Sequence, residues 1–168
     1  MDSPIFGIPG DRGMGTQMKT IDERLVRAPL DRIYALASDV ERWPALLPHY
    51  RYVRFRTTGV VEMSANRPFG PANWPTWWVS EMNAGIDAGI RYRHIEGITT
   101  GMDVLWSFEP RREGTHVRIV HEWDGPGWPL ISGLAARGVI GPVFVHGIAS
   151  RTLAGLAGVA ERGTGESV

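Results

Sequence analysis

Hydrophobic and polar residues alternate along the middle of the chain with the two-residue period of half-buried β-strands. The clearest case places Met102, Val104, Trp106 and Phe108 on one face of a strand. Glycines fall between the alternating segments, at the spacing typical of an antiparallel meander. We predict strands over residues 17–27, 50–57, 60–65, 76–83, 89–96, 102–110 and 115–124, which makes seven.

Two other segments carry apolar residues at helical spacing. The first runs from Ala28 to Val40. We expect Trp43-Pro44 to break or kink it, because the residue before a proline is disfavoured in the α region, which leaves a second short turn over 45–47. The other helix is long and runs from Trp128 to Arg162, with a kink expected at Gly141-Pro142.

One amphipathic helix after a run of antiparallel strands predicts an α+β domain in which a curved sheet wraps around that helix. The 168 residues suffice for one domain with a substantial core. We expect a flexible leader over 1–16, a single ligand-binding domain over 17–162 and a polar tail over 163–168.

The charge balance bears on possible partners. Lys+Arg and Asp+Glu are both 18, so the formal net charge is zero, which argues against a general nucleic-acid-binding protein. The run Arg51 to Arg56 interleaves basic and aromatic side chains but matches no RNA-binding signature. We therefore expect no nucleic-acid partner, and the oligomeric state stays open.

Several functional classes find no support in the composition. The chain has no cysteine, and its five histidines lack metal-binding spacing, so we expect neither a metal nor a cofactor. Arg137, His146 and Arg151 interrupt the apolar C-terminal segment, so it should not span a membrane. The N-terminus does not resemble a signal peptide, and we expect a cytoplasmic protein.

Residues 26–50, VRAPLDRIYALASDVERWPALLPHY, carry a resemblance to a known family. The Ala-Pro helix start, the following Asp, the Trp-Pro and the hydrophobic pair before the next strand resemble the polyketide cyclase/dehydrase and coenzyme-Q-binding branch of the START-like, or helix-grip, superfamily. The resemblance extends more loosely to about Glu161. It implies a seven-stranded curved antiparallel sheet around a long C-terminal helix, two short helices after the first strand, and an elongated apolar cavity for a polyketide, a quinone or a lipid.

The same resemblance implies catalytic positions. Tyr50 and Ser80 fall where the similar aromatase/cyclases keep a pocket tyrosine and a pocket serine, and would bind or polarise carbonyl oxygens during aldol closure and dehydration. Where those enzymes keep a pocket arginine, this chain has Met82. This departure favours a non-catalytic carrier, whereas Tyr50 and Ser80 favour an enzyme.

Arg91 or Arg93 could supply the missing cation and are the other catalytic candidates. They alternate with Tyr92 and His94, so either the arginines or the other pair face the cavity, and the sequence leaves this open.

Seven tryptophans are many for this length, and tryptophan suits an aromatic or isoprenoid ligand. Trp77 and Trp78 are adjacent on one strand and must face opposite sides; the phase set by Ser80 points Trp78 inward. His49 precedes Tyr50 at the expected cavity mouth. The residues expected to bind the ligand are Trp43, His49, Trp78, Met82, Trp106, Phe108, Phe144 and Ile148.

Overall fold

The computed structural model describes residues 18–66, 75–124 and 145–163. Its seven strands form one antiparallel sheet in the order β1-β7-β6-β5-β4-β3-β2. They are β1 (Met18–Val26), β2 (Tyr50–Thr57), β3 (Val60–Asn66), β4 (Pro75–Gly85), β5 (Gly89–Gly97), β6 (Asp103–Arg111) and β7 (Gly114–Trp123). The predicted meander is confirmed, and strand ends differ from the prediction by no more than two residues.

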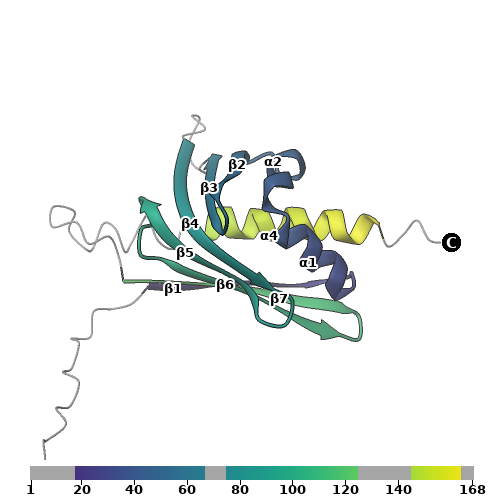
Figure 1. Ribbon diagram of the computed structural model, residues 1–168. Helices are drawn as coiled ribbons and strands as arrows, with labels where there is room; N and C mark the ends of the chain where they lie inside the picture. Colours follow the sequence, from purple (N-terminus) through teal and green to yellow (C-terminus); the bar gives the residue numbers. More distant parts are fainter. Residues whose placement is uncertain (1–17, 67–74, 125–144, 164–168) are drawn as a thin grey trace, which may run out of the picture.

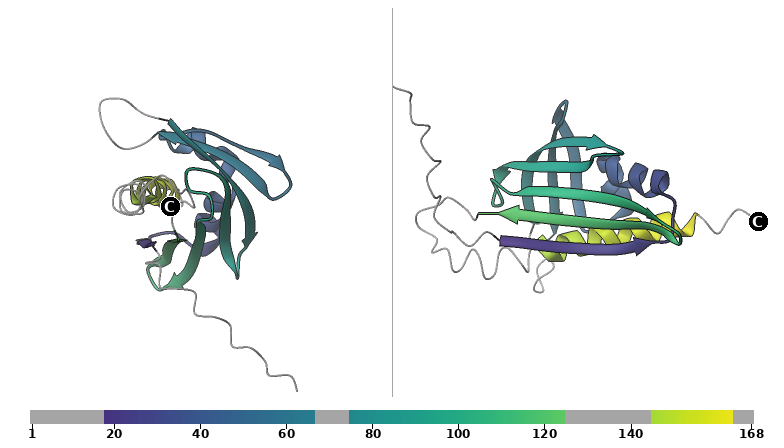
Figure 2. Two further views of the ribbon diagram at one scale, coloured as in Figure 1. Left: turned by 90° about the vertical axis from the view of Figure 1, so that its left-hand side faces the viewer. Right: turned by 90° about the horizontal axis from the view of Figure 1, so that it is seen from below.

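The sheet curves around the C-terminal helix α4 (His146–Arg162), as Figure 1 shows. The end-on view of Figure 2 shows α4 in the hollow of the sheet, which is the architecture expected from the sequence. Only the second half of the predicted C-terminal helix can be compared, because residues 125–144, with the expected kink and Phe144, lie outside the described residues. The expected leader and all of the tail except Gly163 also lie outside them.

The connection from β1 to β2 crosses from one edge of the sheet to the other. It holds α1 (Leu30–Ser38), the 3₁₀ turn η1 (Val40–Arg42) and α2 (Trp43–Leu46). The two short helices expected after the first strand are present, but the expected position of the break is wrong: α1 already ends at Ser38, and α2 begins at Trp43-Pro44. Pro44 occupies the first turn, where a backbone N–H has no intrahelical partner and its absence costs nothing.

One glycine allows two neighbouring strands of the sheet to approach each other closely. Gly97 has φ +99°, and a Cβ there would lie 2.6 Å from the carbonyl oxygen of Trp77 and 3.0 Å from Cα of Trp78. The register between β4 and β5 shifts nearby, between Val79 and Ser80. Only glycine combines this backbone angle with such a close approach, so Gly97 lets β5 lie against the strand segment that carries Trp78.

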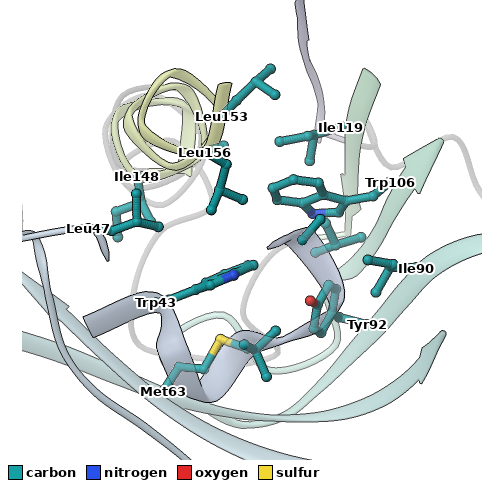
Figure 3. Packing of buried hydrophobic residues seen from close by; sticks show 14 of the residues in the cluster. Trp43, Leu47, Met63, Ile90, Tyr92, Trp106, Ile119, Ile148, Leu153 and Leu156 are labelled. Atoms are coloured by element: carbon teal, nitrogen blue, oxygen red, sulfur yellow. The ribbon is translucent and has the colours of Figure 1, made fainter. Parts of the chain in front are cut away.

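The core lies between the inner face of the sheet and the helices. Side chains alternate along each strand, so Val104 and Trp106 on β6 are buried while Asp103 is exposed. Leu153 and Leu156 on α4 complete the core from the other side (Figure 3). In the part of the chain that the structure describes, no helix is both long enough and apolar enough to cross a membrane.

Candidate functional site

A cavity of about 70 Å³ lies between the inner face of the sheet and α4. Its walls are mainly apolar, and Met63, Trp106, Ile119 and Ile148 in Figure 3 are among the side chains that line it. Strands β2 to β7, helices α2 and α4 and the turn between β5 and β6 all contribute. The cavity therefore depends on the packing of six strands against α2 and α4.

Aromatic rings surround Tyr50 at this cavity. The ring centroid of Tyr50 lies 5.2 Å from that of Trp43 and 6.4 Å from that of Trp78. The ring centroid of Trp106 lies 5.8 Å from that of Trp43. The indole Nε1 of Trp43 donates to the carbonyl oxygen of Leu36 at 3.0 Å, so its orientation is fixed by the end of α1. The rings form a wall suited to a flat apolar ligand.

Tyr50 ends a chain of three hydrogen-bonded side chains. The hydroxyl of Thr152, on α4, lies 3.2 Å from the phenol oxygen of Tyr50 and is a donor to it. The same hydroxyl lies 2.8 Å from the carbonyl oxygen of Ile148, to which it can donate instead, and 3.0 Å from Nε2 of His49. Since Thr152 has a single proton, Nε2–H of His49 can donate to it while Thr152 donates to Tyr50.

Burial keeps the three hydrogen-bonded side chains uncharged. It raises the pKa of the Tyr50 phenol, against the opposing effect of the bond from Thr152, so Tyr50 stays protonated at neutral pH. Burial, and then the charge of Arg151, lower the pKa of His49 to about 4, so its imidazole is neutral. The three side chains thus offer hydrogen bonds without charge.

Two further histidines line the cavity from the sheet. His94 places Nδ1 2.6 Å from the hydroxyl of Thr99 and stacks on Trp78, with 6.0 Å between ring centroids. Burial, and then His121, lower the pKa of His94 to about 3. Nδ1 of His121 is buried and has no hydrogen-bond partner in the described part of the chain.

The pKa of His121 is also lowered to about 3, by burial first and then by His146 on α4. Nδ1 of His146 lies 2.6 Å from Oδ1 of the buried Asp22 on β1. This contact joins the start of α4 to the edge strand β1.

No charged side chain lines the cavity among the residues described. The polar groups of its lining side chains are hydroxyls, neutral imidazoles and the indole N–H groups of tryptophans. The described residues also contain no group of three or more side chains placed to hold a metal ion. Chemically, the site can donate hydrogen bonds to an uncharged ligand with an apolar body and can accept hydrogen bonds from it.

Five of the residues singled out from the sequence line the cavity, namely Trp43, Tyr50, Trp78, Trp106 and Ile148. Trp77 is 48% exposed on the other face, as the alternation along the strand requires. His49 does not line the cavity but is one hydrogen bond away from Tyr50 through Thr152.

Three others lie near the cavity without lining it. Ser80 is fully buried on β4, and its hydroxyl has no hydrogen-bond partner in the regions described. Met82 packs against the core two residues further along. Phe108 packs edge-on against Tyr34 of α1, which takes it away from the ligand space.

Arg91 and Arg93 lie on the outer face of the sheet. Both are exposed, and Arg93 pairs with Asp103, also on the outer face. Tyr92 and His94 are the pair that faces the cavity. The two arginines therefore point away from a ligand in the cavity, because successive side chains of a strand alternate between faces.

The sequence reasoning missed the polar residue at the centre of the site. Thr152 stands four residues after Ile148, on the same face of α4, and this spacing could have indicated it. The two-residue period could not decide whether Tyr92 and His94 or the alternating Arg91 and Arg93 face the cavity. Thr99 lies in the turn between β5 and β6, where no pattern points to it.

A curved antiparallel sheet around a C-terminal helix, with a cavity between them, defines the chain as a helix-grip, START-like protein. Residues 26–143 match the family described as "Polyketide cyclase / dehydrase and lipid transport", and the chain belongs to this family. A Streptomyces cyaneus protein named "Putative polyketide cyclase" is 28% identical over 108 residues, which are 62% of this chain and 71% of the relative.

Solved structures share the fold at low sequence identity. The Zhui aromatase/cyclase of Streptomyces sp. R1128 has a TM-score of 0.74 and 18% identity, over 90% of this chain and 98% of the other. A START superfamily protein of Mycobacterium smegmatis has a TM-score of 0.63 and 14% identity, over 87% of this chain and 97% of the other.

Proposed function

We propose that the protein is a cofactor-free polyketide aromatase/cyclase, which holds an uncharged poly-β-ketone in the cavity and promotes aldol ring closure followed by loss of water. The observation that carries the proposal is the hydrogen-bonded chain of Tyr50, Thr152 and His49 at an otherwise mainly apolar wall. The family and the name of the Streptomyces relative support it.

In an aldol closure an enol carbon bonds to a ketone carbon, and the ketone oxygen takes up a proton. We assign Tyr50 to this oxygen, as a protonated phenol that donates to it. Thr152, as donor to the phenol oxygen, strengthens the phenol as a donor in turn. Ser80 lies opposite His94 between β4 and β5 and could reach a ligand only after the cavity widens towards β4.

The volume of the cavity sets a condition on this function. Ligand pockets for drug-sized molecules have volumes of about 300–1,000 Å³, whereas this cavity has about 70 Å³. A polyketide can therefore enter only if the wall moves. Met63 and Met102 stand in that wall, and methionine side chains adapt to a new shape at low cost.

A synthetic poly-β-ketone thioester tests the proposal, with ring closure followed by chromatography and mass spectrometry against a protein-free control. Tyr50→Phe should lose much more turnover than affinity, because the hydroxyl acts on the oxygen that changes during reaction. Ser80→Ala and the double variant Tyr50→Phe/Ser80→Ala test whether the serine contributes to turnover. Equal product formation by wild type and the double variant would overturn the catalytic assignment.

A non-catalytic carrier of a quinone or a lipid is the second candidate. The cavity lining without charges among the described residues favours it, as does Met82 at the position where the resemblance expects an arginine. Native mass spectrometry of freshly purified protein separates the two candidates. A stoichiometric quinone or lipid supports the carrier, and an empty protein that cyclises the thioester supports the enzyme.

A further inference from the structure

Tyr92 carries a buried hydroxyl that nothing in the described protein satisfies. The side chain extends from β5, lines the cavity and is 6% exposed, and its oxygen has no hydrogen-bond partner among the described residues. Figure 3 shows this hydroxyl turned inward, towards Trp43. A buried polar group without a partner costs stability, so its retention at a cavity wall calls for a partner from outside the protein.

Tyr50 lines the same cavity. Trp43, towards which the hydroxyl of Tyr92 turns, has its ring centroid 5.2 Å from that of Tyr50, so both tyrosines lie beside the same indole. Because Thr152 can donate to the oxygen of Tyr50, the proton of Tyr50 remains free for a ligand. The cavity thus holds two phenol donors whose protons no described residue accepts.

We propose that Tyr92 is a second ligand-binding residue, and that Tyr50 and Tyr92 bind the two neighbouring oxygens of a β-diketone unit. The inference rests on the proposed function and names the residues that bind neighbouring oxygens of its ligand. Two uncharged donors, with no charged side chain among the described lining residues, suit keto or enol oxygens and give a carboxylate no counter-charge.

The position of Tyr92 in the sheet also supports a role in ligand binding. In the register between β4 and β5, Tyr92 stands directly opposite Met82. Met82 occupies the place where the resemblance expects an arginine, and its thioether is only a weak hydrogen-bond acceptor. Tyr92 supplies, from the next strand, the donor that the methionine cannot.

Three probes with one carbon skeleton test the inference: butylbenzene without oxygen, butyrophenone with one keto oxygen and benzoylacetone with two. Their dissociation constants are measured by quenching of tryptophan fluorescence, at a pH at which benzoylacetone is uncharged. We expect wild type to gain about fivefold in affinity with each oxygen, as one net hydrogen bond gives. In Tyr92→Phe the second gain should disappear and the affinity for butylbenzene should stay.

The matched control is Tyr34→Phe, because Tyr34 on α1 packs against Phe108 and does not line the cavity. Thermal unfolding of the empty protein gives an independent readout. Tyr92→Phe should melt at a higher temperature than wild type, since it removes an unsatisfied buried group. A lower melting temperature would mean that the hydroxyl has a partner in the empty protein, and the inference would fall.

The outcomes separate this inference from the proposed function. If wild type binds none of the three probes, the ligand-binding function itself fails. If wild type binds all three and Tyr92→Phe keeps the full preference for benzoylacetone, the cavity binds ligands but Tyr92 has no part in choosing them. Loss of that preference in Tyr92→Phe, with Tyr34→Phe unchanged, supports the inference.

Discussion

The hydroxyl of Thr152 lies 3.2 Å from the phenol oxygen of Tyr50, so one hydrogen bond joins α4 to β2 beside the cavity. His49, adjacent to Tyr50 on the chain, reaches the same hydroxyl at 3.0 Å. A single side chain of the helix therefore orders Tyr50 in the cavity wall and His49 next to it on the chain.

Replacing Thr152 by Val keeps the shape of the side chain and removes its hydroxyl. Tyr50 and His49 then lose their shared partner, and we expect the free energy of unfolding to fall by about 1–2 kcal/mol. Urea unfolding measures the loss. Thr152→Ser, which keeps the hydroxyl and removes the methyl group, should lose clearly less, and a larger loss in Thr152→Ser than in Thr152→Val would mean that the methyl group, rather than the hydroxyl, carries the stabilisation.

Met63→Ala should widen the cavity. We expect the free energy of unfolding to fall by about 2–5 kcal/mol, because a buried side chain is shortened. Butylbenzene should bind more tightly, because fewer lining side chains have to move to admit it. The matched control is Val61→Ala on the same strand, which is fully buried and does not line the cavity. A similar gain in affinity in both variants would show that general loosening, rather than cavity volume, controls entry.

Gly97→Ala should destabilise the protein by about 2 kcal/mol or more, because it combines an unfavourable backbone angle with a clash against the backbone of β4. Gly101→Ala is the control: its φ is +89°, but its Cβ would meet only Nε1 of Trp123 at 3.9 Å. Chemical denaturation compares the two. If both lose the same stability, the clash is relieved by a small shift of the strands.

Glu62 should make stability depend on acid pH. On the outer face of β3 it accepts hydrogen bonds from Tyr52 at 2.8 Å and from Arg56 and Arg54 at 3.0 Å each. The bonds from Tyr52 and Arg56 lower its pKa most, from 4.5 to about 2. A lowered folded-state pKa means that this stabilisation is complete above about pH 4.5 and is lost as the pH falls towards 2.

The measurement is the urea midpoint between pH 5 and 2, compared with Glu62→Gln, which cannot titrate. The wild type should lose stability more steeply than the variant over this interval. Parallel curves would show that other carboxylates account for the acid sensitivity.

Much of the fold could be predicted, because half-buried strands leave a two-residue period that a single sequence displays. The same period placed Trp78 inward and Trp77 outward. The wrong prediction at Trp43-Pro44 has a local cause: the chain already leaves α1 after Ser38, so Pro44 begins a helix instead of interrupting one.

The candidate site could be predicted only in part. Tyr50 came from a motif, whereas Thr152 stands 102 residues further along the chain, and no local pattern encodes their contact. The volume of the cavity depends on how far side chains such as Met63 and Met102 fill the space, which sequence periodicity does not determine. Residue types indicated a polar site, but tertiary packing decides which hydroxyls share it.

The pairing of β1 with β7 has a consequence for the order of folding. The meander from β2 to β7 can form by successive local pairings, whereas β1 must wait for a partner made about ninety residues later. On a growing chain the first strand to be made is thus the last to join the sheet, and until then the exposed edge of β1 is open to pairing with other chains. Pulse-labelling hydrogen exchange should find the amides of β1 protected after those of β3 and β4.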